Sequence, residues 1–359
     1  MKELTTHERM TRMFEHRDAD RVPITDWIWE STFERWLREG LSLEGNVFDN
    51  LGIDHILWLG EDIVDTSPRI EKVVIEETDT YKIERNEWGV TIKNFKPVSS
   101  TPQDLDFVIK DPDSWRAAKE RMTPSRDRIQ WDRLQANYKK WREQGSWIVF
   151  CPWFGFDITS TRMCGTERIM VAMAEEPEWC WDMFNTELDL TIALMDMMWD
   201  AGYAFDALLW FDDMAYRNGM FFSPRMYKEL VKPYQQRAID WAHAKGIKAQ
   251  LHCCGNITHL LPELLDMGID AFHPMEVKAG TDPVALKKAF GDRLLLHGGF
   301  DVRHWENIEE AEADIRAVLP ALKESGGYLF SCDHSVPDSV SLSNYRRIVE
   351  LVKEIGSYT

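Results

Sequence analysis

The sequence carries a His-x-Cys pair and a distant cysteine that together could bind a metal ion. His252, Cys253 and Cys254 stand where an apolar run enters a Gly-Asn turn, and Cys332 ends a second apolar run. Because side chains alternate along a strand, His252 and Cys254 point to one face and Cys253 to the other. If the two strand ends are neighbours, His252, Cys254 and Cys332 give zinc three ligands and an open fourth position, which is typical of catalytic zinc. Buried cysteines of an apolar core are the alternative explanation of this spacing.

Acidic residues and a further histidine follow other apolar runs. Asp212 and Asp213 are adjacent, so only one of them can face the centre of a barrel, and a helix cap or loop hydrogen bond explains either one equally well. Glu276 is a candidate acid, a substrate hydrogen-bond partner or a fourth zinc ligand. We predict Asp213 and Glu276 as catalytic residues and Asp212 and His297 as substrate-binding residues.

Tryptophan is unusually frequent, with 16 residues in a chain of 359. Four of them stand at or near expected strand ends: Trp27, Trp29, Trp58 and Trp153. Aromatic rings pack well against flat ligands, so these four are predicted to form the walls of a substrate pocket. Ordinary packing in the core or beneath a lid is the alternative explanation.

Eight near-continuous apolar runs alternate with segments of helical periodicity. Such runs are expected of parallel strands buried on both faces, and eight of them with intervening helices predict a (β/α)8 TIM barrel, an α/β fold. Active sites of such barrels lie at the carboxyl ends of the strands, where the candidate residues stand. A small antiparallel β insertion is predicted near residues 72–106. The eight runs cover residues 21–29, 55–60, 147–153, 207–212, 247–252, 271–276, 293–298 and 327–332.

The charge balance is acidic, with 61 Asp and Glu against 42 Lys and Arg and a formal net charge of -19. This excess argues against nucleic acid and against an anionic membrane surface as partners. No apolar run reaches the ~18 residues of a membrane-spanning helix, and the N-terminus has no apolar signal core, so we expect a cytoplasmic protein. The six cysteines are then expected to be reduced.

With these residues in hand, the chain resembles the uroporphyrinogen decarboxylase superfamily over nearly its full length. The resemblance implies a single TIM-barrel domain over residues 1–359. The decarboxylase carries an arginine-rich segment after its first strand, whereas residues 27–32 here contain no arginine, which argues against porphyrinogen decarboxylation. The stretches that carry the resemblance are Asp20-Arg-Val-Pro23, Asp212-Asp213-Met, Phe222-Ser-Pro224, Leu251-His-Cys-Cys-Gly-Asn256, Gly268-Ile-Asp270, Gly298-Gly-Phe-Asp301 and the run that ends at Cys332.

The His-x-Cys pair with a distant cysteine looks instead like the cobalamin-dependent methyltransferase branch. That resemblance implies Zn2+ bound by His252, Cys254 and Cys332, and a separate corrinoid protein as partner. We therefore expect methyl transfer between a small molecule and the cobalt of that corrinoid, with O-demethylation of a methoxylated aromatic compound favoured because of the tryptophans.

Three other functions stay open at this point. Transfer from methylcobalamin to a thiol would use the same zinc position, and decarboxylation of a porphyrinogen-like substrate would need cationic groups at the pocket mouth. A module that only binds zinc or a corrinoid is the alternative that involves no catalysis. The sequence is also compatible with a homo-oligomer.

Overall fold

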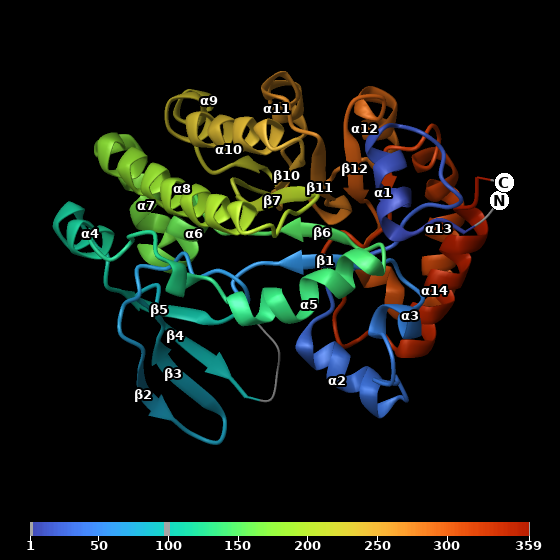
Figure 1. The fold of residues 1–359 in the computed structure, drawn as a ribbon, viewed down its shortest axis with the longest axis horizontal. Helices are drawn as coiled ribbons and strands as arrows, with labels where there is room; N and C mark the ends of the chain where they lie inside the picture. Colours follow the sequence, from blue (N-terminus) through green and yellow to red (C-terminus); the bar gives the residue numbers. More distant parts are fainter. Residues whose placement is uncertain (1–2, 97–100, 359) are drawn as a thin grey trace.

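The computed structural model describes residues 3–96 and 101–358, and a curved parallel sheet forms its centre (Figure 1). Seven strands pair in the order β1-β6-β7-β10-β11-β12-β13, so consecutive parallel strands are neighbours. Their side chains are almost all buried, in agreement with the apolar runs of the sequence. The strands are β1 Ile56–Leu59, β6 Trp147–Phe150, β7 Ala207–Phe211, β10 Lys248–His252, β11 Ala271–Met275, β12 Leu295–Gly298 and β13 Tyr328–Leu329.

Helices cover the outside of this sheet, as expected of an α/β fold (Figure 1). The longest, α8, packs against its neighbours α7 and α10, and many of its apolar side chains are buried. The principal helices are α1 Thr6–Phe14, α2 Glu30–Arg38, α4 Pro112–Lys119, α5 Trp131–Glu143, α7 Thr166–Glu175, α8 Pro177–Asp200, α10 Lys232–Ala244, α11 Leu261–Met267, α12 Pro283–Phe290, α13 Ile308–Leu322 and α14 Leu342–Ile355. Shorter helical segments are α3 Val47–Leu51, α6 Phe156–Ile158, η2 Thr159–Met163, α9 Pro224–Met226 and η3 Tyr227–Val231.

The predicted closed barrel is confirmed only in part, because the first expected strand, residues 21–29, does not form a continuous ladder. It makes isolated parallel bridges, Ile24 with Phe330 and Ile28 with Val336. Two local features explain the interruption. Pro23 has no amide hydrogen to donate, and the Ile24 amide donates to the carboxylate of Asp54 at 2.8 Å instead of to a strand. The sheet therefore contains seven of the eight expected strands.

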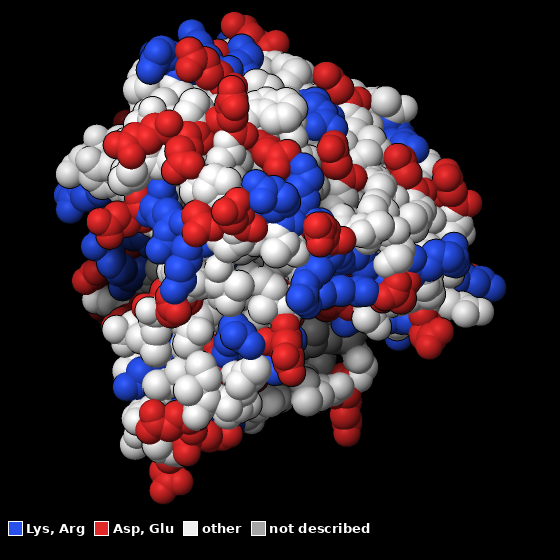
Figure 2. Space-filling model, turned by 90° about the vertical axis from the view of Figure 1, so that its left-hand side faces the viewer, with Lys and Arg blue, Asp and Glu red and all other residues white. Residues whose placement is uncertain are grey.

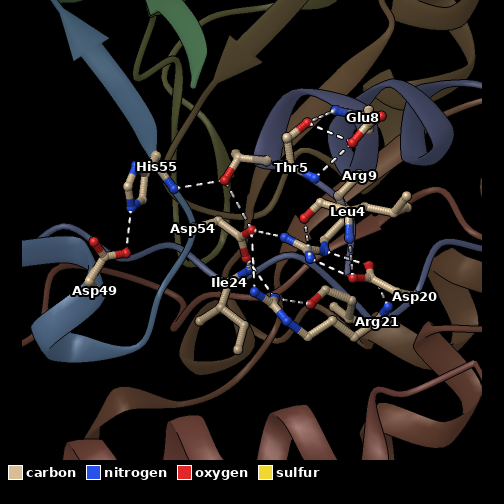
Figure 3. A network of polar contacts seen from close by, with 12 residues as sticks. Leu4, Thr5, Glu8, Arg9, Asp20, Arg21, Ile24, Asp49, Asp54 and His55 are labelled. Atoms are coloured by element: carbon tan, nitrogen blue, oxygen red, sulfur yellow. Dashed lines mark hydrogen bonds and ion pairs between the residues drawn. The ribbon is translucent and has the colours of Figure 1, made fainter. Parts of the chain in front are cut away.

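A buried ion network attaches this first segment to the start of β1 (Figure 3). Arg9 Nε donates to Asp20 Oδ1 at 2.7 Å, and Arg9 also pairs with Asp54. Arg21 donates to Asp54 Oδ2 at 2.7 Å. Burial alone would raise the pKa of Asp54, but the guanidinium groups of Arg21 and Arg9 hold it below its usual value. The Asp20-Arg-Val-Pro23 stretch thus has a structural role at the amino ends of the strands.

The predicted antiparallel insertion is present as a four-stranded sheet. Its strands are β2 Val73–Glu77, β3 Tyr81–Arg85, β4 Val90–Phe95 and β5 Gln103–Phe107, paired in that order. The fourth strand lies within the predicted range but was not expected from the sequence pattern. The insertion lies on the side of the molecule toward which β1 and β6 point (Figure 1). A short hairpin, β8 Ala215–Tyr216 with β9 Gly219–Met220, follows β7.

Two further expectations concern membranes and cysteines. Within residues 3–96 and 101–358, no helix is both long and apolar enough to cross a membrane. All six cysteines are free thiols, as predicted for a reduced protein.

Candidate active site

A cavity of about 320 Å³ opens where the parallel strands end. Five predicted site residues line it: Trp27, Trp153, Asp213, His252 and Cys254. The remaining lining residues are Asp157, Phe211, His273, Pro274, His334 and Ser335. Two larger grooves beside α7 and α8 contain none of the predicted site residues. The concentration of metal-ligand atoms and aromatic rings identifies the smaller cavity as the candidate active site.

Three ligand-type side chains meet at one wall of this cavity. His252 ends β10, Cys254 follows two residues later, and Asp213 follows the neighbouring strand β7. His252 Nε2 lies 3.4 Å from Cys254 Sγ and 3.5 Å from Asp213 Oδ1. All three ligand atoms lie within 4.8 Å of one another. The edges of a tetrahedron around zinc measure about 3.4–3.6 Å for such ligands, so the two distances from His252 Nε2 match a zinc site.

Burial perturbs both members of the His-x-Cys pair. It lowers the pKa of His252, so the imidazole is neutral and can offer a lone pair. Burial, followed by the nearby charges of Asp213 and Glu276, raises the pKa of Cys254 well above its usual value. A thiol in this environment ionises only if a nearby cation compensates the negative charge of the thiolate. A bound metal ion would be such a cation.

Cys332, the third predicted ligand, does not join this group. Its Sγ donates to the carbonyl of His334 at 2.6 Å, and its amide donates to Asp26 Oδ1 at 2.8 Å. Burial raises the pKa of Asp26 to about 7. Asp213, which sequence analysis assigned as a catalytic acid, is the third donor that the structure brings to His252 and Cys254. The assignment of Cys332 as a zinc ligand stays a prediction.

The adjacent Asp212 points away from the cavity, as expected for neighbouring residues on a strand. Its Oδ2 accepts hydrogen bonds from the Tyr234 hydroxyl and from Gln235 Nε2, the latter at 2.7 Å. Burial raises its pKa to about 7. Glu276 also lies outside the cavity lining, where it accepts from the amide of Gly255. Both predicted site residues thus hold the surrounding loops in position.

The other predicted residues lie beside or beneath the cavity. Trp58 stacks on His297, with ring centroids 6.2 Å apart, and lies 5.0 Å from Trp27. His297 is buried, neither ring nitrogen has a hydrogen-bond partner among the described residues, and burial lowers its pKa to about 3. Trp29 contacts His334 edge-on, at a centroid distance of 6.2 Å. The structure therefore places Trp27 and Trp153, but not Trp58, Trp29 or His297, in the cavity lining.

Asp157 is a cavity residue that sequence analysis missed. It follows β6 in a turn whose amides are fixed from the helix layer: Gly155 N donates to Glu187 Oε2 at 2.7 Å, and Asp157 N donates to Asp212 Oδ1 at 3.2 Å. Its carboxyl group is buried and accepts no hydrogen bond within the described part of the chain. Burial, then Asp213 and Asp212, raise its pKa well above the usual value. The sequence signal that could have pointed to Asp157 is its position shortly after the apolar run 147–153, an expected strand.

Comparison with known families identifies the chain. Residues 155–355 match the uroporphyrinogen decarboxylase (URO-D) family. The chain belongs to this family. The matched region contains the three clustered donors, Asp157 and Cys332, whereas Trp27, Trp29 and Trp58 precede it. In this URO-D family member, no Lys or Arg among the described residues lines the cavity.

One solved structure agrees with the fold of this URO-D family member. A methyltransferase from Methanosarcina mazei is similar with a TM-score of 0.66 over 98% of this chain and 99% of that one. The two sequences are 16% identical, so the likeness establishes the fold alone. A putative vitamin-B12 independent methionine synthase from Listeria monocytogenes has a TM-score of 0.44 at 12% identity, over 94% of this chain and 98% of its own. No curated protein matches the sequence.

Proposed function

We propose that this protein is a zinc-dependent methyltransferase that transfers a methyl group from a methoxylated aromatic compound to a separate corrinoid protein. The observation that carries the proposal is the cluster of Asp213, His252 and Cys254 at the wall of an aromatic cavity. Membership of the URO-D family and a fold shared with a protein described as a methyltransferase support it.

The reaction breaks the bond between the methyl carbon and the ether oxygen. The Co(I) centre of the partner corrinoid supplies two electrons to the new cobalt–carbon bond and becomes methyl-Co(III). The oxygen keeps the former bonding pair and leaves as a phenolate, which takes a proton from solvent. Zinc, held by His252 and Cys254 with Cys332 or Asp213 as third ligand, would supply Lewis acidity toward this oxygen.

Side chains of this protein would position the donor. Trp153 and Phe211 are stacked with ring centroids 4.8 Å apart, and Trp27 lies 5.7 Å from Phe211. A flat ring packs against such walls through offset or edge contacts worth about 0.5–1.5 kcal/mol per pair beyond burial. The same walls exclude water from the reacting oxygen and carbon.

Metal analysis and a methylation assay test the proposal. Purified protein should contain about one equivalent of zinc, and His252→Ala with Cys254→Ala should abolish binding. Free Co(I) cobalamin, monitored spectroscopically, should become methylated in the presence of a methoxyaromatic donor. Zinc well below one equivalent would overturn the proposal. So would methylation of Co(I) by methanol, or demethylation of methylcobalamin by a thiol, when no methoxyaromatic reacts. Carbon dioxide release from uroporphyrinogen would favour the decarboxylase alternative, which the lack of lining cations disfavours.

We also propose that the whole chain is one domain. Residues 21–29 would supply the strand that the seven-stranded sheet lacks and so complete a (β/α)8 barrel. The bridges of Ile24 with Phe330 and of Ile28 with Val336 support this arrangement. A single cooperative unfolding transition is expected by calorimetry, and two well-separated transitions would contradict it.

A further inference from the structure

The charges that face the cavity limit the substrates that it can take. Asp157 and Asp213 present carboxyl groups to it, and the nearest basic side chains are already engaged. The Arg162 guanidinium stacks 4.2 Å from the ring centroid of Trp153 and pairs with a glutamate, and Lys278 Nζ lies 3.6 Å from Glu276 Oε1. On the side of the molecule toward which β1 and β6 point, basic and acidic side chains are interspersed (Figure 2). Apart from the proposed zinc ion, whose open position is reserved for the ether oxygen, a carboxylate within the cavity would therefore meet no free Lys or Arg side chain among the described residues.

Asp157 offers a hydrogen-bonding group with no internal partner. Its backbone amide is fixed by Asp212, and the preceding amide of Phe156 donates to the Tyr234 hydroxyl at 3.1 Å. The backbone at Asp157 is thus held in place, and its carboxyl group accepts no hydrogen bond within the described part of the chain. Asp157 is only 5% exposed. The carboxyl group lines the cavity, so a ligand that supplies a hydroxyl donor can form a hydrogen bond with it there.

The size of the cavity limits the ligand to a small molecule. A volume of about 320 Å³ is at the lower end of the range for ligand pockets, which suits a single substituted ring. Trp27, Trp153 and Phe211 supply flat walls for such a ring, whereas Asp157 supplies one polar contact.

We propose that the methyl donor is an uncharged methoxyphenol whose free hydroxyl hydrogen-bonds to the Asp157 carboxyl group, and that a ring carboxylate is excluded. The inference rests on the proposed methyltransferase function and names its substrate class. A carboxyl oxygen accepts from a phenol hydroxyl in either protonation state, so the contact does not depend on the charge of Asp157. When the ether oxygen occupies the zinc position, a ring carboxylate, in contrast, would be desolvated beside Asp157 and Asp213 without a Lys or Arg counter-ion.

The test uses the zinc-loaded full-length chain with free Co(I) cobalamin and three donors that differ in one group. The donors are 2-methoxyphenol, methoxybenzene and 4-hydroxy-3-methoxybenzoate. We expect kcat/KM to be highest for 2-methoxyphenol, about 10–100-fold lower for methoxybenzene, which lacks the hydroxyl, and lowest for the carboxylated donor. Quenching of tryptophan fluorescence by each donor, measured without cobalamin, should follow the same order.

Asp157→Ala separates a binding role from a structural one. In this variant kcat/KM should fall for 2-methoxyphenol and stay unchanged for methoxybenzene, so that the two values differ by no more than about threefold. Asp79→Ala, an exposed change in the turn between β2 and β3, is the control and should keep the wild-type order.

Each contrary result has a distinct meaning. Equal or better use of the carboxylated donor would overturn the substrate class, and an equal loss for all donors in Asp157→Ala would overturn the hydroxyl contact. Failure of every methoxyaromatic to methylate Co(I), while methanol methylates it or a thiol demethylates methylcobalamin, would overturn the proposed function and the inference with it. Methylation by methoxyaromatics without the expected preference for 2-methoxyphenol would overturn the inference alone.

Discussion

Nδ1 of His252, the last residue of β10, and Nδ1 of His273, in the middle of the neighbouring strand β11, lie 2.7 Å apart. One of the two nitrogens must donate the proton of this hydrogen bond. If His252 binds metal through Nε2, its Nδ1 carries the hydrogen and His273 accepts. His273 would then fix both the tautomer and the ring orientation of the metal ligand, which is the usual role of the group behind a ligating histidine.

The first prediction follows from this pair. His273→Ala should weaken zinc binding about 10–100-fold, because His252 loses the acceptor that orients it. His273→Asn retains an acceptor oxygen and should recover part of the affinity. Competition with a chromophoric chelator measures the zinc affinity, and circular dichroism checks the fold. Unchanged affinity in the alanine variant would show that His252 needs no such partner.

The second prediction concerns the two adjacent cysteines. Cys253 is fully buried, and its Sγ accepts from the amide of Met214 at 3.3 Å, on the opposite side of the chain from Cys254. Cys253→Ala should leave zinc content unchanged and lower the free energy of unfolding by about 1–3 kcal/mol. Cys254→Ala should lose the metal. The assigned register would be refuted by equal zinc loss in the two variants.

The third prediction separates the candidates for the third ligand. Thiolates are softer ligands than carboxylates and suit zinc better, so we expect the Cys332 thiol to exchange its bond with the His334 carbonyl for the metal. In the cobalt(II)-substituted protein, Cys332→Ala should then remove about half of the thiolate-to-cobalt absorption. Asp213→Asn should leave that absorption intact. Unchanged thiolate absorption in Cys332→Ala, together with weaker cobalt binding in Asp213→Asn, would assign the third position to Asp213.

The fourth prediction is a pH dependence that originates at His297. Burial and then the positive charge of a protonated His252 lower its pKa to about 3 in the folded protein, whereas an unfolded histidine titrates near 6.5. Below pH ~6.5 the unfolded state therefore binds the extra proton, and this group destabilises the protein as the pH falls from about 6.5 toward 3.

His297→Phe should remove this contribution and preserve the stacking on Trp58. The free energy of unfolding of the variant should fall less steeply between pH 6.5 and 4.5, by up to about 1.4 kcal/mol per pH unit. Urea unfolding at several pH values measures the slopes. Parallel slopes in the two proteins would mean that His297 is not the responsible group.

Much of the fold follows from sequence pattern alone. The continuous apolar runs predict buried parallel strands because both faces of such a sheet are covered, and seven of the eight runs form strands. The insertion is predicted where short β-type segments after residue 72 interrupt the alternation of apolar runs and helices, and its strands are largely half-buried or exposed. Segment 21–29 has the pattern of a strand, but Pro23 and the Asp54 carboxylate interrupt its ladder. The hydrogen bond from the Ile24 amide to Asp54 joins residues that no local sequence pattern connects.

The candidate site, too, is determined partly by sequence pattern and partly by tertiary packing. Strand alternation determined that His252 and Cys254 face one side, that Cys253 faces the other, and that one of Asp212 and Asp213 points inward. The sequence could not decide which carboxylates enter the cavity, because that depends on the packing of loops from different strands. Only the tertiary structure brings Asp157 and His273 to the site, turns Asp212 toward Tyr234, and leaves Cys332 bonded to the His334 carbonyl. Residue types and their periodicity are local properties, whereas a ligand set is defined by distances between strand ends that are far apart in the chain.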